Sequence, residues 1–221
     1  MRAAVYIDGF NLYYGIRAMM RARGAGELRW LDILELSRKL LPRDDVVVVR
    51  YFTALVDDRP DQPGTAARQR AYLRALGTLP GVELHFGTFR TRRVRLPRSN
   101  SKPGEPRTVE VLRTEEKGSD VNLATYLLLD GFQDRYDVAA VVTNDSDLAE
   151  PIRVVREQLR KEVFVVTPQP PMVNELRRVT TRVRDLRPGV VARCQLPVPV
   201  IDAQGREIRP PSTWGPIPPR P

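Results

Sequence analysis

The sequence of 221 residues is poor in the side chains that bind metals through sulfur or imidazole, with one cysteine and one histidine. Cys194 has no second cysteine in the chain to pair with, and no Cys-based metal motif exists. His85 alone excludes a zinc site built from several histidines. It also lies in a predicted strand, where packing is its expected role. Any metal ion that the chain binds must therefore be held by oxygen ligands.

Long apolar runs are also missing. No stretch approaches the roughly 18 consecutive apolar residues of a membrane helix, and the first residues contain no apolar leader. We therefore expect a soluble, cytoplasmic protein that does not contact a membrane. No Gly-x-Gly-x-x-Gly motif follows any predicted strand, which disfavours a role in dinucleotide binding.

Lysine is scarce, since only four of the 36 basic residues are lysines. Against 27 acidic residues, the basic residues leave a formal net charge of +9 and a pI near 10.2. Such a charge favours a polyanionic partner, of which nucleic acid is the commonest. A GC-rich coding bias would produce the same excess of arginine, alanine and proline. Charge by itself therefore leaves the partner open.

Apolar runs that end in carboxylates are the main feature of the sequence. The run Val138–Val142 leads into Asp145 and Asp147, and the run Ala3–Ile7 leads into Asp8. Five apolar residues in succession indicate strands that are buried on both faces, as in a parallel α/β sheet. Ligands of such sheets bind at the carboxyl ends of the strands. We therefore expect these acids to share one edge of the sheet.

The remaining patterns predict a sheet whose strands alternate with helices, with right-handed crossovers. Strands are expected at residues 3–7, 45–52, 82–89, 137–143 and 162–167, and helices at 10–23, 31–41, 65–79, 120–134, 148–160 and 172–180. We expect a folded domain over residues 1–186 and a Pro-rich, basic C-terminal extension over residues 187–221. Within the extension, residues 190–201 and 206–209 are predicted to form a β-ribbon, and Trp214 to anchor the tail.

Residues 89–112 are predicted to form a β-arm with a turn at residues 100–107. Its outgoing strand carries five arginines, which are Arg90, Arg92, Arg93, Arg95 and Arg98. We expect them to hold the phosphate backbone of a nucleic acid with little base stacking, because aromatic residues are scarce there. The alternative is an arm that maintains solubility or contacts a second subunit of a homodimer.

A third acid, Asp120, follows Lys117 at the start of a predicted helix. Each acid also has a structural interpretation, such as Asp8 in a turn or Asp147 in a capping box with Glu150. Carboxylates gathered at one edge, however, raise each other's pKa unless a cation neutralises them. Mg²⁺ or Mn²⁺ prefers such ligands, and it can activate water and stabilise charge on a phosphate. Lys117 either assists this chemistry or is a solvated loop residue.

Three segments resemble the signature blocks of the NYN domain, a PIN-like group of metal-dependent nucleases that includes bacterial LabA-type proteins. They are VYIDGFNL at residues 5–12, KGSDVNLA at 117–124 and VTNDSDL at 142–148. The resemblance covers about residues 2–167. It implies a PIN-like, Rossmannoid three-layer sandwich with a central, mainly parallel sheet in the order 3-2-1-4-5. It also implies Mg²⁺ or Mn²⁺ as the cofactor and RNA as the substrate.

The expected site combines the residues of these blocks. The resemblance makes four acids the metal ligands and catalytic residues, namely Asp8, Asp120, Asp145 and Asp147. Lys117 is added as a catalytic residue, and the supporting polar residues are Asn11, Asn122 and Ser146.

A metal-dependent ribonuclease is the leading hypothesis. One alternative is an RNA-binding or scaffolding module with a vestigial site. Another is a haloacid-dehalogenase-like phosphatase that uses Asp145 and Asp147, which leaves Asp8 and Asp120 without a role. The sequence leaves open which RNA is cleaved, and whether cleavage is internal or from an end.

Overall fold

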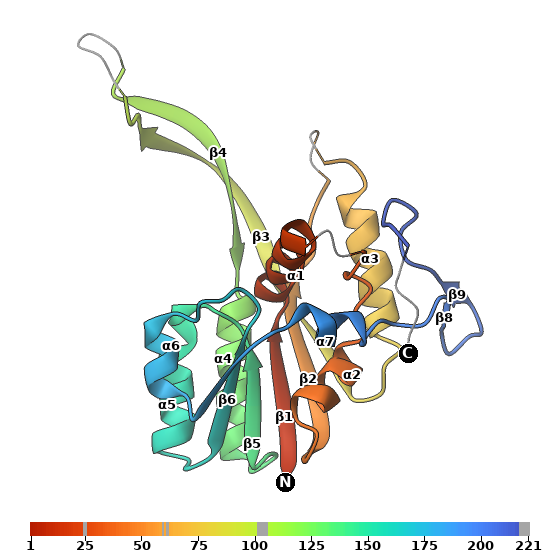
Figure 1. Ribbon diagram of the computed structural model, residues 1–221. Helices are drawn as coiled ribbons and strands as arrows, with labels where there is room; N and C mark the ends of the chain where they lie inside the picture. The colour runs from red at the N-terminus through yellow and green to blue at the C-terminus, as the bar shows by residue number, and fades with distance from the viewer. Residues whose placement is uncertain (24–25, 59, 61, 101–105, 217–221) are drawn as a thin grey trace.

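The computed structural model of the chain describes residues 1–23, 26–58, 60, 62–100 and 106–216 (Figure 1). Strands of one sheet in this part are β1 (Arg2–Asp8), β2 (Asp45–Ala54), β3 (Val82–Pro97), β4 (Thr108–Lys117), β5 (Val138–Val142), β6 (Glu162–Thr167) and β7 (Arg182–Asp185). Their order is β4-β3-β2-β1-β5-β6-β7, and all adjacent strands are parallel except β3 and β4. Counting only the five strands expected from the sequence, this order reads 3-2-1-4-5. The mostly parallel sheet confirms the predicted α/β class.

Helices cover both faces of the sheet (Figure 1). They are α1 (Gly9–Arg23), α2 (Ile33–Leu40), α3 (Thr65–Leu76), α4 (Ser119–Phe132), α5 (Ala149–Glu157), α6 (Asn174–Val179) and α7 (Pro188–Ala192), with a short 3₁₀ helix, η1 (Ser146–Leu148), before α5. One face packs against α1, α2, α3 and α7, and the other against α4, α5 and α6. Among the described residues, no helix is both long and apolar enough to cross a bilayer.

The apolar sequence of the central strand β1 is explained by its burial on both faces of the sheet. Val5 and Ile7 lie in the hydrophobic cluster on the α1 side, whereas Ala4 and Tyr6 lie in the cluster on the α4 side. Successive residues of a strand face opposite sides, so a strand covered on both faces has no solvent-facing position for polar residues. By contrast, all four residues of edge strand β7 are exposed. Its charged sequence carries no apolar pattern, which is why it was not predicted as a strand.

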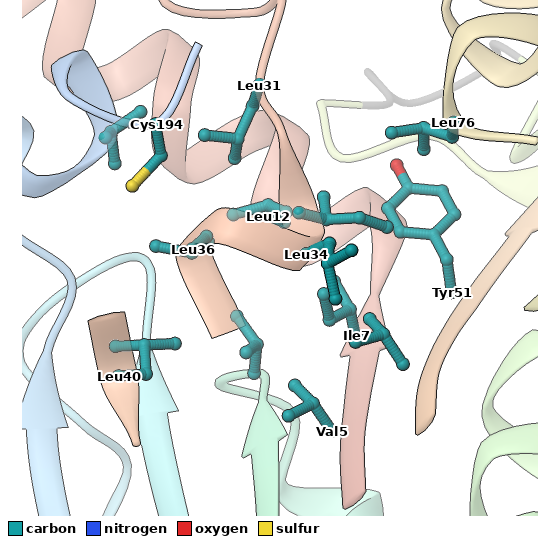
Figure 2. Packing of buried hydrophobic residues seen from close by; sticks show 14 of the residues in the cluster. Val5, Ile7, Leu12, Leu31, Leu34, Leu36, Leu40, Tyr51, Leu76 and Cys194 are labelled. Carbon is teal, nitrogen blue, oxygen red and sulfur yellow. The ribbon is translucent and has the colours of Figure 1, made fainter. Parts of the chain in front are cut away.

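The segment after residue 187 packs onto the domain. The backbone N–H of Leu196 donates to the carbonyl of Trp30 at 2.8 Å, and the carbonyl of Cys194 accepts from Asp32 N–H at 2.7 Å. Cys194 is buried in the same hydrophobic cluster as Leu31 (Figure 2). The tail therefore contributes to the main hydrophobic core.

The predicted ribbon in this tail is shorter than expected. Only β8 (Val200–Ile201) and β9 (Glu207–Ile208) pair, in antiparallel orientation. The first part of the predicted strand instead forms α7, in which Pro188 occupies the first turn. Proline suits that position because its fixed φ matches a helix and its missing N–H would have no helical partner.

Strand β3 belongs to both the sheet and the arm. Its residues 82–87 pair with β2, and its residues 88–97 pair with β4 as a hairpin that projects from the domain (Figure 1). The arm predicted from the sequence is thus present. Residues 101–105 of its predicted turn lie outside the described residues, as do residues 217–221 at the C-terminus.

Candidate active site

A cavity of about 860 Å³ opens at the carboxyl ends of β1 and β5, beside the root of the arm. Three of the four predicted acids line it: Asp8 at the end of β1, Asp120 in the first turn of α4, and Asp145 after β5. β1 has β2 on one side and β5 on the other, so the chain connections leave the sheet in opposite directions here. Such switch points are where open α/β sheets bind ligands.

Asp8 is held in one orientation. Its side chain is only 4% exposed. Oδ1 accepts the backbone N–H groups of Phe10 and Asn11 at 3.1 and 3.0 Å, and Oδ2 accepts from Asn11 Nδ2 at 2.5 Å and from Thr143 Oγ1 at 3.2 Å. Burial raises the pKa of Asp8, while these hydrogen bonds oppose the rise. The result is a buried carboxylate whose position the surrounding chain determines.

Gly9 allows α1 to begin directly after Asp8. A Cβ at this position would lie 2.7 Å from the carbonyl oxygen of Phe52 and 2.7 Å from the ring of Tyr51. Any larger residue would therefore push α1 away from β2 and displace Asp8. Asn11 links the two strand ends as well, because its Oδ1 accepts the backbone N–H of Asn144 at 3.1 Å.

Asp145 has both a structural contact and a place on the cavity wall. Its Oδ1 accepts the backbone N–H of Asp147 at 2.9 Å and caps η1, and its own N–H donates to Thr143 Oγ1 at 3.1 Å. Asp145 caps η1, whereas α5 has Leu148 at its N-cap and no side-chain cap, so the expected capping box of Asp147 and Glu150 does not form. Asp147 and Ser146 are exposed and do not line the cavity.

The pKa of Asp120 is affected by the other acids at this edge of the sheet. Burial raises its pKa to about 7, together with the negative charges of Asp8, Asp145, Glu116 and Asp147, in decreasing order. A half-buried carboxylate with four acidic neighbours is destabilised when ionised. All four predicted acids therefore interact, although Asp147 stands outside the cavity wall.

The helix that carries Asp120, α4, is held near its C-terminus by buried hydrogen bonds. Near its C-terminus, Asp130 is fully buried and accepts from Arg50 Nε at 2.7 Å and from Tyr6 Oη at 2.8 Å. At its N-terminus the cap residue is Gly118, with φ of 102° and no side-chain cap. Asn122, predicted as a support, donates to the carbonyl of Phe86 at 3.3 Å and does not reach the cavity.

Glu116 is an acid that the sequence analysis missed. It lines the cavity and accepts from the N–H of Ser119 at 3.0 Å and from its hydroxyl at 2.8 Å. Along β4, Thr114 and Glu116 line the cavity, as the two-residue period of a strand requires. That alternation was the available signal.

Lys117 lies on the opposite face of β4, which corrects its placement among the catalytic residues. Its ammonium is 3.1 Å from Glu115, and the two residues border a separate hollow together with Arg90 and Arg92. Consecutive strand residues face opposite sides, so Lys117 cannot share the face of Glu116.

The same alternation divides the arginines of the arm. Phe89 and Thr91 line the cavity, so Arg93 and Arg95 continue their face of β3, whereas Arg90 and Arg92 lie on the reverse face. All five predicted arginines, with Arg98 near the tip, are exposed. Binding of nucleic acid by them stays a prediction.

The acids fit a hard divalent cation by their chemistry. Carboxylates are the ligands that Mg²⁺ and Mn²⁺ prefer, and the raised pKa of Asp120 reflects negative charge that a cation would neutralise. Within the described residues, however, no three Asp, Glu, His or Cys side chains are near enough together to form a ready-made metal site. The side chains would have to move toward a bound ion.

The other end of the cavity was not predicted at all. There, Tyr13 and Arg17 of α1, Arg29, Tyr72 of α3 and Trp214 of the tail line the wall. They come from four separate segments of the chain, and each one alone has an ordinary surface or packing interpretation. The cavity is thus acidic at one end and aromatic and basic at the other.

Two comparisons with known proteins concern nearly the whole chain. The 6-hydroxy-3-succinoylpyridine 3-monooxygenase HspA of Pseudomonas putida strain S16 is 29% identical over 97% of this chain and 76% of its own length. The crystal structure of a protein of unknown function from Vibrio parahaemolyticus matches with a TM-score of 0.51 and 15% identity, over 85% of this chain and 93% of that one. This second likeness supports the fold alone.

Asp8, Asp120 and Asp145, which line the cavity, fall within the three segments that suggested a family. The model of the NYN domain family matches residues 2–187, which include β1, β5, α4 and the arm. The protein therefore belongs to the NYN domain family.

Proposed function

We propose that the chain is a divalent-metal-dependent ribonuclease that hydrolyses phosphodiester bonds at the acidic end of the cavity. The observation that carries the proposal is that Asp8, Asp120 and Asp145 line one cavity at the sheet edge of an NYN domain, and the raised pKa of Asp120 supports it. Gathering repelling carboxylates costs stability. Such a cost is expected where a cation is to be bound.

The residues would have different tasks. Asp8, Asp120 and Asp145 would hold Mg²⁺ or Mn²⁺, with Asp147 at the outer side. When bound, the ion supplies an activated water and neutralises charge on the phosphate. Asn11 and Thr143 would keep the Asp8 carboxylate in place through their hydrogen bonds to Oδ2. Glu116 adds negative charge, but its carboxylate is already occupied by Ser119.

Binding of RNA would begin on the arm. Arg93 and Arg95 lie on the face that leads to the cavity, whereas Arg90 and Arg92 lie on the reverse face. Arg92 lies 3.5 Å from Glu115 and Arg93 lies 3.9 Å from Glu110, so both are partly neutralised. The expected contacts are to phosphates and are independent of sequence. This arrangement would bring a polyanion toward an acidic site in an otherwise basic protein.

The test is to incubate the purified chain with labelled single- and double-stranded RNA and DNA, with Mn²⁺, with Mg²⁺ or with EDTA. Cleavage of RNA that requires the added ion supports the proposal. Binding of RNA without any cleavage would favour an RNA-binding module with an inactive site. Undiminished cleavage in EDTA would rule out the metal-dependent mechanism.

A second candidate is a monooxygenase that acts on an aromatic ring. It is favoured by the 29% identity to HspA over 97% of the chain and by the aromatic end of the cavity. Its test is oxygen consumption when 6-hydroxy-3-succinoylpyridine and a two-electron reductant are added. Substrate-dependent consumption would support this candidate, and its absence would remove it.

A further inference from the structure

The wall of the cavity continues from the acids along one face of α1. Phe10, Tyr13, Tyr14 and Arg17 all line it, at positions i, i+3, i+4 and i+7. Residues at this spacing form a single stripe on a helix. At 1.5 Å per residue the stripe is about 10 Å long, from the acidic end to Arg17. One cavity thus connects the site of reaction with a second group of side chains.

The second group is centred on Trp214. Its ring packs edge-on against Trp30, with the centroids 6.2 Å apart, and lies 6.4 Å from the ring of Tyr72. The guanidinium of Arg29 lies 4.6 Å from the centroid of the Trp214 ring. Trp30 Nε1 donates to a backbone carbonyl, whereas the buried Nε1 of Trp214 has no acceptor among the described residues. The aromatic rings around Trp214 thus form an apolar section of the cavity wall, with Arg29 beside it.

Positive charge surrounds the same aromatic rings. The guanidinium of Arg17 lies 5.6 Å from the ring centroid of Tyr13 and has no ion pair in the described parts of the chain. The guanidinium of Arg29 is held by the buried Glu27. Arg29 Nε donates to Glu27 Oε1 at 2.8 Å, and Arg29 Nη2 donates to Glu27 Oε2 at 2.5 Å. Arg17 is therefore less compensated in charge than Arg29.

Two carboxylates also line the cavity, and one of them already accepts hydrogen bonds from the backbone. They are those of Asp57 and Asp58. Asp58 accepts the backbone N–H groups of Gly64 and Ala66 at 3.1 and 2.8 Å, and these bonds lower its pKa. The Asp58 carboxylate thus accepts hydrogen bonds from the backbone at the start of α3. The space suits a ligand with a planar ring and an anionic group.

We propose that the aromatic end of the cavity binds one unstacked nucleotide of single-stranded RNA, next to the phosphodiester that meets the acids. The base lies against Trp214 and Tyr13, and the phosphate lies at Arg17. Every base has a flat face that stacks on aromatic rings, so the subsite tolerates different bases. A base paired within a duplex cannot enter, which makes single strands the substrate class. The inference rests on the proposed ribonuclease function.

The experiment measures binding without cleavage. Calorimetric titration of the full chain in EDTA with AMP, ribose 5-phosphate and adenosine separates the contributions of base and phosphate. We expect AMP to bind at least tenfold more tightly than either fragment. Arg17→Ala and Trp214→Ala should each weaken AMP binding at least tenfold, and Trp214→Phe should retain part of it. Arg21→Ala is the matched control, because Arg21 is an exposed residue on α1 that does not line the cavity.

The outcomes test the nucleotide subsite independently of the proposed ribonuclease activity. Equal binding of AMP and ribose 5-phosphate, or AMP binding unchanged in Arg17→Ala, would overturn the nucleotide subsite even if metal-dependent cleavage of RNA is observed. Selective AMP binding in a protein that cleaves no RNA would support the subsite and contradict the ribonuclease function. If nicotinate, a small aromatic carboxylate, binds more tightly than AMP, the cavity belongs to a free aromatic acid instead. Melting temperatures of all variants identify any loss that is due to unfolding.

Discussion

The two ends of the cavity are built in different ways. At the acidic end, Asp8 is the last residue of β1 and Asp145 follows the neighbouring parallel strand β5, and backbone N–H groups hold their carboxylates. At the aromatic end, Trp214 and Arg29 are brought together only by packing of the C-terminal tail against the domain. The acidic end therefore follows from local sequence and topology. The aromatic end depends on long-range packing, and changes in the tail should affect it selectively.

The largest expected effect is the loss of RNA cleavage when Asp8 or Asp145 is replaced, and only the Asp8 variant should also lose stability. Asp8→Asn and Asp145→Asn should each lower metal-dependent RNA cleavage by about 1,000-fold or more, because each removes an anionic ligand. Asp8→Asn should also destabilise the fold by about 1–3 kcal/mol, since an amide NH₂ at Oδ2 would face the donors of Asn11 and Thr143. Cleavage assays and thermal melts check both effects. An Asp8→Asn protein with unchanged melting temperature would show that its hydrogen bonds contribute little.

The next effect concerns the aromatic end. Leu196 is 2% exposed and lies in the core that joins the tail to the domain. Leu196→Ala should cost about 2–4 kcal/mol of unfolding free energy and weaken AMP binding. Ile201→Ala is the control, because Ile201 lies in the same tail and is 53% exposed. Denaturant unfolding measures the difference. Equal stability of the two variants would contradict the packing of the tail.

Asp120 predicts a dependence of stability on pH at the acidic end. Its pKa of about 7 in the folded state lies above its ordinary value, so the folded state favours the protonated acid. This group therefore destabilises the metal-free protein progressively as the pH rises from about 4 to 7, by about 1–2 kcal/mol after allowance for solvent screening. Asp120→Asn should remove this contribution, and added Mn²⁺ at pH 8 should offset it. Melting temperatures across this pH range measure the effect, and a profile identical in wild type and Asp120→Asn would contradict it.

The smallest expected effect is on the salt dependence of RNA binding, and it should differ between the two faces of the arm. Replacing Arg93 and Arg95 with Ala should flatten the slope of log K against log salt for single-stranded RNA by about 1.4, or 0.7 for each phosphate that the protein no longer neutralises. Replacing Arg90 and Arg92 should change it by less than half as much, because both lie on the face of the arm that is turned away from the cavity. Affinities measured at several salt concentrations decide the matter. Equal slopes for the two pairs would mean that the RNA does not follow the cavity face.

Particular residues show what the sequence could predict. Asp8 and Asp145 were identifiable because buried apolar strands precede them, and parallel strands bring their carboxyl ends to one edge. Asp120 came from its place at a helix start and from the NYN resemblance. Lys117 was expected at the site and Glu116 was missed, since the sequence did not show which face of β4 meets the cavity. Strand alternation distinguishes them only when the pairing with β3 is known.

The tail shows why the remainder was unpredictable. Its prolines indicated an extension, and Trp214 was expected to be an anchor, but its partners Trp30 and Tyr72 lie more than one hundred residues earlier in the chain. Packing at such separations depends on the shape of the assembled core and leaves no periodic signal. The helix at residues 188–192 has the same origin, since five residues are too few to form a stable helix without tertiary contacts.

The most direct test of the central claim is the rate of single-stranded RNA cleavage as a function of Mn²⁺ concentration, in wild type, Asp120→Asn and Glu150→Gln. Glu150 is an exposed acid that pairs with Arg153 at 2.6 Å, outside the cavity. The account predicts a rate that saturates with Mn²⁺ in wild type and in Glu150→Gln, and a rate reduced by about 100-fold or more in Asp120→Asn, as expected when the ion loses a ligand. Equal rates in Asp120→Asn and wild type at every Mn²⁺ concentration would contradict it.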